Sequence, residues 1–177
     1  MGFVQILRRS IPPGDRVVVS PPVYPPFYDA IPEAGGVVER VPLLRAAAGY
    51  ELDLAGIEAA LSGGARAVLL CSPHNPTGTV HTRDSLARLA EIAEANGAIV
   101  ISDEIHAPLA QPDVVFTPFL AASDAAARVG YAVTSASKAF NVAGLKCALM
   151  IATDSKRFQL VRELPETMKP RNIPIAT

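Results

Sequence analysis

Two short runs of apolar residues, Ala67–Cys71 and Ala98–Ile101, constrain the fold more than any other feature of the sequence. Strands that are apolar at every position are typical of a parallel sheet that is covered on both faces. The segment between the two runs has the period of a helix, with Thr82 as its cap and Asn96-Gly97 as its stop. Parallel strands need such a crossover, so the sequence predicts a βαβ unit within an α/β domain whose sheet is largely parallel.

The rest of the chain alternates between strand and helix patterns in the same way. Short apolar or alternating runs predict further strands at 17–19, 37–43, 129–133 and 147–152. Amphipathic spacing, together with caps and stops, predicts helices at 3–11, 27–34, 54–61 and 155–164. Asp53 is expected to cap the third of these helices. The stretch 111–126, which contains two prolines and many alanines, is the only candidate linker.

Composition and charge exclude several classes of function. The chain has 177 residues, half of them apolar, and a net charge of −1, which is enough for one compact domain with a buried core. The basic residues are scattered along the sequence, so we expect no nucleic-acid partner. No apolar run approaches the roughly 18 residues that a membrane span needs, and no signal-peptide pattern is visible. We therefore expect a cytoplasmic protein with no membrane partner.

The two cysteines, Cys71 and Cys147, each lie in an apolar run. Free cysteines in such runs usually behave as small hydrophobic side chains. We expect both thiols to be buried and inert, rather than catalytic or joined in a disulfide bond.

Polar segments follow the predicted strands at the places where function is expected. Open parallel sheets bind their ligands beyond the carboxyl ends of the strands. The polar segments at those ends are 20–24, 72–78, 103–106 and 134–146. Each contains side chains that a hydrophobic core does not need, so the candidate site should be sought among them.

Asn75 lies in a rigid segment, because two prolines and a glycine surround it between Pro73 and Gly78. Its amide can both donate and accept hydrogen bonds, as a ligand-binding residue must. The same residues also form ordinary turns. This segment alone therefore leaves a structural and a functional interpretation equally open.

Asp103 and Lys138 are the charged residues at strand ends that are most informative about function. Asp103 either anchors a loop or faces a cationic ligand, and without context the loop role is favoured. Lys138 stands in the hydroxyl-rich segment 134–138 directly after a strand, where its amine can act as a nucleophile that forms a Schiff base. A solvated surface lysine is the usual alternative, but such lysines rarely stand among small hydroxyl residues between two apolar strands.

An amine, a carboxylate, an amide, hydroxyl groups and an aromatic ring together match the requirements of pyridoxal 5'-phosphate (PLP). A Mg²⁺ site on Asp103 and Glu104 would explain the acidic residues but neither the lysine segment nor the Asn-Pro turn, so we expect no metal. A dinucleotide site would need a Gly-x-Gly-x-x-Gly turn, which the sequence lacks.

Three segments resemble the signature segments of the class I/II aminotransferases, which are PLP enzymes of fold type I. They are Ser72-Pro73-His74-Asn75-Pro76-Thr77-Gly78, Asp103-Glu104-Ile105-His106 and Ser135-Ala136-Ser137-Lys138-Ala139-Phe140-Asn141. Their order and separation make the combination specific, and the likeness runs from about Gly2 to Ala152. Within the superfamily they are most similar to the cystathionine β-lyase-like, or cysteine-S-conjugate β-lyase, branch.

The resemblance implies a role for each matching residue around the ring of PLP. Lys138 would form the Schiff-base link to the cofactor and act as general acid and base. Asp103 would pair with the pyridinium nitrogen, Asn75 would donate to the ring oxygen, and Tyr24 would stack on the ring.

The resemblance also implies residues for the phosphate and a preference for one branch. Ser135 and Ser137 would hold the phosphate. Many relatives place an Arg eight residues after the lysine, but this sequence has Lys146, which supplies charge without bidentate geometry. His106 occupies the place where many aminotransferases keep a Tyr that contacts the ring oxygen, which favours the lyase branch.

The resemblance implies a three-layer α/β/α architecture, that of the large PLP-binding domain, incomplete at both ends. Residues 1–154 would form this partial domain. Residues 155–177 would be a helix and a loosely held tail that lead toward an absent C-terminal domain. Full-length relatives would be homodimers.

Three functions follow as alternatives. The first is a PLP-dependent carbon–sulfur β-lyase that converts cystathionine or cysteine S-conjugates, which are small amino-acid substrates, to ammonia, pyruvate and a thiol. The second is an amino-acid aminotransferase. The third is a truncated, catalytically inactive fragment of a PLP enzyme.

Overall fold

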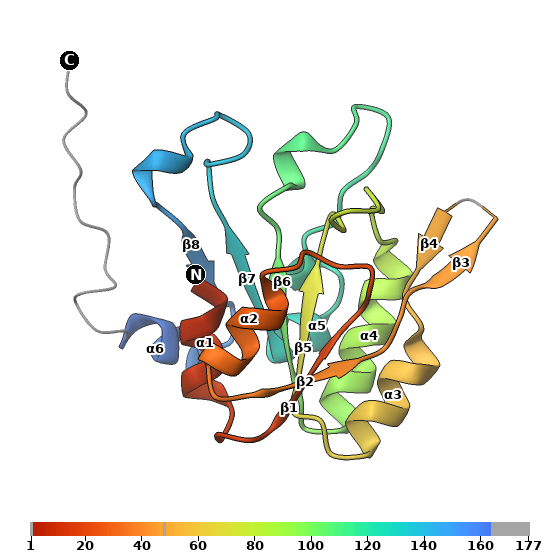
Figure 1. Ribbon diagram of the computed structural model, residues 1–177, viewed down its shortest axis with the longest axis vertical. Coiled ribbons are helices and arrows are strands. Elements are labelled where there is room, and N and C mark those ends of the chain that lie inside the picture. Colours follow the sequence, from red (N-terminus) through yellow and green to blue (C-terminus); the bar gives the residue numbers. More distant parts are fainter. Residues whose placement is uncertain (1, 48, 164–177) are drawn as a thin grey trace.

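A six-stranded sheet with the strand order β2-β1-β5-β6-β7-β8 runs through the centre of the molecule (Figure 1). The computed structural model describes residues 2–47 and 49–163. Neighbouring strands are parallel except for β7 and β8, which are antiparallel. The strands are β1 (Arg16–Val19), β2 (Val37–Arg40), β5 (Ala67–Cys71), β6 (Ile99–Asp103), β7 (Gly130–Thr134) and β8 (Leu149–Ile151).

Helices cover both faces of the sheet and complete a three-layer α/β/α arrangement (Figure 1). One layer consists of α3 (Leu54–Ser62), α4 (Arg83–Ala95) and α5 (Asp124–Val129). The other consists of α1 (Gly2–Ser10), α2 (Phe27–Glu33) and α6 (Ser155–Arg162). The predicted fold class is therefore confirmed.

Alternate residues of each central strand enter the two opposite cores. Val68 and Val100 pack against the layer of α3, α4 and α5, whereas Leu69 and Ile101 pack against α1 and α2. Every residue of β5 and β6 is buried. Covering on both faces is why β5, and β6 as far as Ile101, are apolar at each position.

The predicted cap and stop of α4 are confirmed. The Thr82 hydroxyl accepts a hydrogen bond of 3.2 Å from the Ser85 N–H, which satisfies one free donor of the first turn. Asp53 caps α3 in the same way through the Gly56 N–H, at 2.8 Å. The buried side chains of α4 are Leu86, Leu89, Ala90, Ile92 and Ala93.

The candidate linker at 111–126 was wrong in its second half, which packs into the core. Phe119 is fully buried in the short 3₁₀ helix Phe119–Ala121, and Ala125 and Ala126 of α5 are buried beside it. The buried Glu104 carboxylate accepts the Phe119 N–H at 2.8 Å. Ser123 caps α5 by accepting the Ala126 N–H.

Two strand predictions need correction. β2 ends at Arg40 rather than at Leu43, although the Val41 and Leu43 N–H groups still donate to the Val19 and Pro21 carbonyls at 3.0 and 2.7 Å. The chain then forms a small antiparallel hairpin of β3 (Leu44–Ala46) and β4 (Gly49–Glu51), which the apolar pattern did not predict.

The prediction of two buried cysteines is only half correct. Cys71 is buried at the end of β5, but Cys147 is exposed. Cys147 precedes β8, which lies at the edge of the sheet and leaves Leu149 and Ile151 60% and 41% exposed. An apolar run at a sheet edge looks in sequence like a buried strand, so the pattern could not tell these cases apart.

Some predictions fall on residues outside the described ranges. The end of the last helix at Leu164 and the tail at 168–177 are among them. Among the described helices, none combines the length and the apolar character that crossing a bilayer requires.

The packing of α4 gives a prediction about stability. Leu89→Ala should lower the free energy of unfolding by about 2–5 kcal/mol, because Leu89 is fully buried in the layer of α3, α4 and α5. Arg88→Ala, at the next position, should lower it by less than about 1 kcal/mol, because Arg88 is exposed and forms only surface ion pairs. Urea unfolding of both variants measures the difference, and equal losses would contradict the assigned helix faces.

Candidate active site

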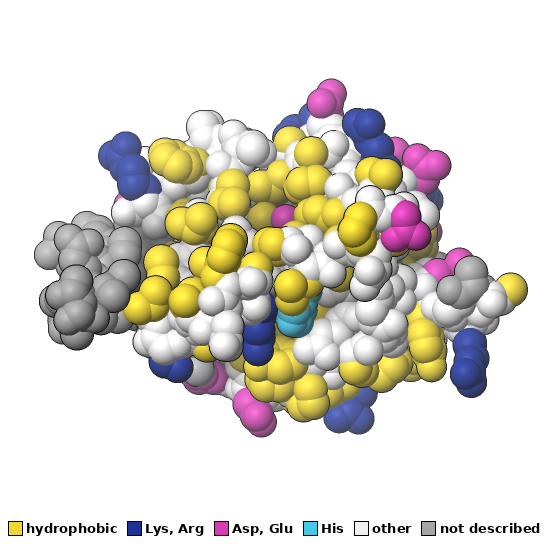
Figure 2. Space-filling model, turned by 90° about the horizontal axis from the view of Figure 1, so that it is seen from above, with side chains coloured by type: hydrophobic (Ala, Val, Ile, Leu, Met, Phe, Trp, Pro, Cys, Tyr) yellow, Lys and Arg dark blue, Asp and Glu magenta, His cyan; other side chains and the backbone are white. Residues whose placement is uncertain are grey.

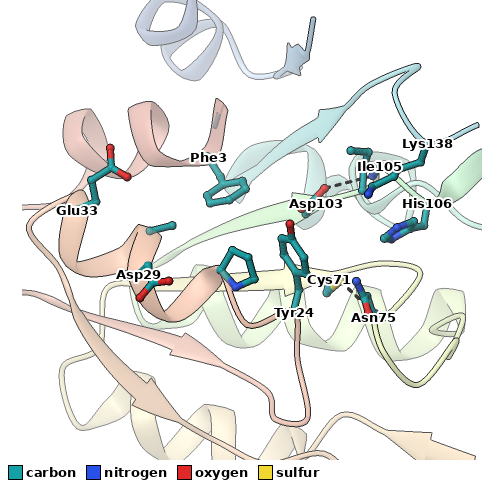
Figure 3. A pocket seen from close by; sticks show the side chains of 12 residues that line it. Phe3, Tyr24, Asp29, Glu33, Cys71, Asn75, Asp103, Ile105, His106 and Lys138 are labelled. Carbon is teal, nitrogen blue, oxygen red and sulfur yellow. Dashed lines mark hydrogen bonds between the residues drawn. The ribbon is translucent and has the colours of Figure 1, made fainter. Parts of the chain in front are cut away.

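A cavity of about 350 Å³ opens at the carboxyl ends of β1, β5 and β6. The space-filling view of this end shows a hollow surrounded by hydrophobic side chains (Figure 2). The close-up shows side chains from several loops converging on the cavity (Figure 3). Its lining residues are Phe3, Tyr24, Pro26, Asp29, Ala30, Glu33, Cys71, Asn75, Asp103, Ile105, His106 and Lys138. Five of the residues predicted from sequence are in this set: Tyr24, Asn75, Asp103, His106 and Lys138.

Parallel pairing of β5 and β6 brings two of these residues together. In the register of the pair Cys71 lies opposite Asp103, and the Ser72 N–H donates to the Asp103 carbonyl at 2.9 Å. The two strands therefore end side by side. Asn75 and Asp103 reach the same cavity although 27 residues of sequence, including α4, separate them.

Asp103 supplies a carboxylate on the inner wall of the cavity. The residue is only 8% exposed, and its Oδ1 accepts the Ile105 N–H at 3.2 Å. Burial raises the pKa of Asp103 to about 6, although the bond from Ile105 acts in the opposite direction. A cation placed in the cavity would stabilise the charged form, so this carboxylate is suited to a positively charged ligand group.

Tyr24 stands opposite Asp103 in the loop that follows β1 (Figure 3). Its ring packs edge-on against Phe27, with 5.9 Å between ring centroids, and Phe27 packs in the same way against Phe3 at 5.3 Å. This row of aromatic rings fixes the orientation of Tyr24, which remains 37% exposed. Tyr24 therefore presents an aromatic surface to whatever occupies the cavity.

Asn75 belongs to a closed turn that follows β5. The His74 N–H donates to the Thr79 carbonyl at 2.8 Å, and the Gly78 N–H donates to the His74 carbonyl at 2.7 Å. Gly78 has a φ of +73°, a conformation that glycine adopts without strain. The Asn75 N–H donates to the Cys71 Sγ at 3.2 Å. The backbone of Asn75 is thus held, while its side chain lines the cavity.

Lys138 and His106 lie next to each other at the side of the cavity away from Phe3 (Figure 3). Lys138 comes from the loop after β7, and His106 from the turn after β6. Burial lowers the pKa of His106, and the positive charge of Lys138 lowers it further. His106 is therefore a neutral group beside an amine at neutral pH.

The three residues predicted to bind phosphate do not line this cavity. Ser135 is buried, and its hydroxyl lies 2.5 Å from the Ser137 hydroxyl and donates to the Cys147 carbonyl at 2.6 Å. Lys146 is exposed and has a left-handed backbone with a φ of 52°. All three belong to the loop that carries Lys138, so the structure places them near the amine but not around the same hollow.

Several lining residues were not predicted from sequence. Ile105 stands between two predicted residues, and the spacing of that segment could have suggested it. Cys71 was expected to be inert, and burial does raise the pKa of its thiol to about 12, but it forms part of the wall. Asp29 and Glu33 lie one helical turn apart on α2, and nothing but that spacing distinguishes them from other surface acids.

Comparisons with known proteins identify the family of the chain. The family model described as aminotransferase class I and II matches residues 3–175. A cystathionine beta-lyase of Bacillus subtilis is 39% identical over 143 residues, which are 80% of this chain and 37% of that protein. The chain thus spans well under half the length of this relative.

Two solved structures resemble the fold closely. Cystalysin from Treponema denticola, which contains a pyridoxal 5'-phosphate cofactor, has a TM-score of 0.84 and 30% identity over 90% of this chain and 41% of that one. N-succinyldiaminopimelate aminotransferase from Mycobacterium tuberculosis has a TM-score of 0.82 and 30% identity over 91% of this chain and 41% of that one. With the family match over almost its whole length, the chain belongs to the aminotransferase class I and II family.

Proposed function

We propose that this chain binds PLP in the cavity between Tyr24 and Asp103, and that it is part of a carbon–sulfur β-lyase. The observation that carries the proposal is the convergence of a carboxylate, an amide, an aromatic ring and an amine on one hollow. Its volume of about 350 Å³ lies within the range of roughly 300–1,000 Å³ that is usual for cofactor sites. When bound, PLP supplies an electron sink for negative charge at the α-carbon of an amino acid.

Each residue of the cavity has a task that follows from its surroundings. The buried Asp103 carboxylate would keep a proton on the ring nitrogen, because burial strengthens its attraction to a cation. Asn75 would donate to the ring oxygen, and the neutral His106 stands beside the same region. Tyr24 would cover one face of the ring.

Lys138 has two tasks in the proposed reaction. Its Nζ would hold PLP covalently through the cofactor's aldehyde carbon, and it would be a free amine while a substrate is bound. The freed amine would take the proton from the substrate α-carbon. Overall, the bond between the β-carbon and sulfur would break, the proton held by Lys138 would leave with the thiol, and one water molecule would be consumed as pyruvate and ammonia are formed.

The lyase is preferred to the aminotransferase because of the named relatives and the sequence around His106. The relative from Bacillus subtilis is a lyase, and the segment Asp103–His106 resembles the lyase branch. An aminotransferase is the second candidate, since an aminotransferase matches the fold almost equally well. Both reactions begin with the same proton transfer to Lys138.

One prediction of the proposed function concerns cofactor binding. The purified chain mixed with PLP should develop an absorbance band of lysine-bound cofactor, and borohydride reduction followed by peptide mapping should place the label on Lys138. Lys138→Ala should abolish the band, whereas Lys156→Ala, on exposed α6, should keep it. Label spread over several lysines would contradict the proposed site.

A second prediction uses the raised pKa of Asp103. The folded carboxyl group has a pKa of about 6, above its ordinary value of 3.8, so it binds its proton more tightly than in the unfolded chain. The folded protein should lose stability as the pH rises from about 3.8 to about 6. Asp103→Asn keeps an acceptor for Ile105 but has no charge to bury.

This variant should be more stable than the wild-type chain at pH 7, by roughly 1–3 kcal/mol, and of similar stability near pH 3. Urea unfolding at the two pH values measures the difference. The variant should also bind PLP more weakly. A constant stability difference across this pH range would show that Asp103 is not the group whose ionisation is disfavoured.

A third prediction separates the two reactions. With PLP bound, L-cystathionine or an S-alkyl-L-cysteine should yield pyruvate, measured with lactate dehydrogenase and NADH. Lys138→Ala should lower the rate by roughly 10²–10⁴-fold, the usual contribution of a general acid–base group. Formation of glutamate from 2-oxoglutarate without pyruvate would identify an aminotransferase. No product from either mixture would favour the inactive fragment.

A further inference from the structure

Two histidines that do not line the cofactor cavity are packed together behind its wall. His74 and His81 are 2% and 4% exposed. Their rings meet edge to face with 5.6 Å between centroids. Burial lowers the pKa of both imidazoles, and burial together with the neighbouring His74 lowers that of His81 to about 4. Both rings are therefore neutral near pH 7, and neither has a task in the proposed reaction.

His74 joins two loops that carry residues of the cavity. Its Nε2 lies 2.9 Å from the Pro22 carbonyl oxygen, and because a carbonyl only accepts, the ring nitrogen carries the hydrogen. Pro22 lies two residues before Tyr24, and His74 directly precedes Asn75. This one hydrogen bond therefore connects the loop of the aromatic ring with the turn of the amide.

His81 secures the other end of the same turn. Its Nε2 donates to the Cys71 carbonyl at 3.2 Å. The Sγ of Cys71 accepts the Asn75 N–H. The contacts thus form a continuous path from Pro22 through both imidazole rings to Cys71 and Asn75.

A role in packing alone does not explain a histidine at position 74. The Nδ1 atom of His74 is buried and has no hydrogen-bond partner in the described part of the chain. Burying an unpaired polar atom costs free energy, and a leucine would fill a similar space without that cost. The useful property of the imidazole here is its donor to Pro22.

We propose that His74 is a positioning residue that sets the spacing between Tyr24 and Asn75, with His81 packed against it as a brace. The proposal rests on the proposed roles of Tyr24 and Asn75 toward the cofactor. It adds that the pair of loops is held in its binding arrangement before the cofactor arrives, which reduces the ordering cost of binding.

The first test needs no cofactor. His74→Leu removes the donor at similar size, and His74→Gln keeps an N–H donor at a comparable distance from the backbone. Hydrogen exchange of the His74→Leu chain should be faster by roughly three- to tenfold in residues 20–26 and 72–79 together, as expected for the loss of one hydrogen bond. His74→Gln should restore most of the protection.

Leu89→Ala is the matched control, because it weakens the opposite core without touching either loop. It should accelerate exchange around α4 and leave the two loops close to the wild-type chain. The proposal is overturned if His74→Leu leaves both loops unchanged, or if it accelerates exchange throughout the molecule rather than in these two loops.

The second test uses the cofactor and an analogue of PLP that lacks the ring hydroxyl, the group Asn75 would contact. The wild-type chain should bind PLP more tightly than the analogue, Asn75→Ala should lose this preference, and His74→Leu should reduce it. The double variant should show the same preference between PLP and the analogue as Asn75→Ala, because the two residues then act through one interaction. Fully additive effects would overturn the positioning role.

The two tests separate the proposal from the function on which it rests. If none of the proteins binds PLP, the proposed function fails, while hydrogen exchange still decides whether His74 fixes the two loops. If PLP binds at Lys138 but His74→Leu keeps both the protection of the two loops from hydrogen exchange and the preference for PLP over the analogue, the proposed function stands and the positioning role is wrong.

Discussion

The register between β5 and β6 is the constraint on which the rest of the site depends. With Cys71 paired to Asp103, the two fully buried strands end at the same height. The turn after one strand and the carboxylate at the end of the other then face a single hollow. Open parallel sheets bind their ligands beyond the carboxyl ends of their strands, so the functional groups gather at that edge. The βαβ unit through α4 therefore fixes both the core and the position of the chemistry.

The fold was predictable where burial leaves a strong pattern. The strands covered on both faces, and α4 with its cap at Thr82, followed from apolar periodicity and capping chemistry. The apolar pattern failed where contacts between segments distant in sequence determine which residues are buried. Phe119 packs into the core, and its backbone N–H donates to the carboxylate of Glu104, a contact across 15 residues that no local rule contains. The apolar residues of β8 indicated burial, but the strand lies at the edge of the sheet.

For the candidate site, the sequence identified residues that stand beside prolines, glycines and strand ends. Asn75, Asp103 and Lys138 have such neighbours, and they line one cavity with Tyr24 and His106. Phe3 and the acidic residues of α2 could not be found in this way, because only the packing of the helices turns them toward the hollow. Ser135 and Ser137 are residues whose type could be recognised in the sequence but whose contacts could not. Their hydroxyls are recognisable in sequence, but their hydrogen bonds to one another and to Cys147 depend on the folded loop.

The antiparallel pairing of β7 with β8 has a mechanical consequence for the lysine. Lys138 is carried by the connection between these two strands, so the connection is the tip of a hairpin whose outer strand is one of the two edges of the sheet. The outward peptide groups and exposed apolar side chains of β8 can accept a further strand. Pairing there would stiffen the hairpin from its base and restrict the range of positions open to the amine. Addition of a strand at β8 would therefore also restrict the placement of the Lys138 amine.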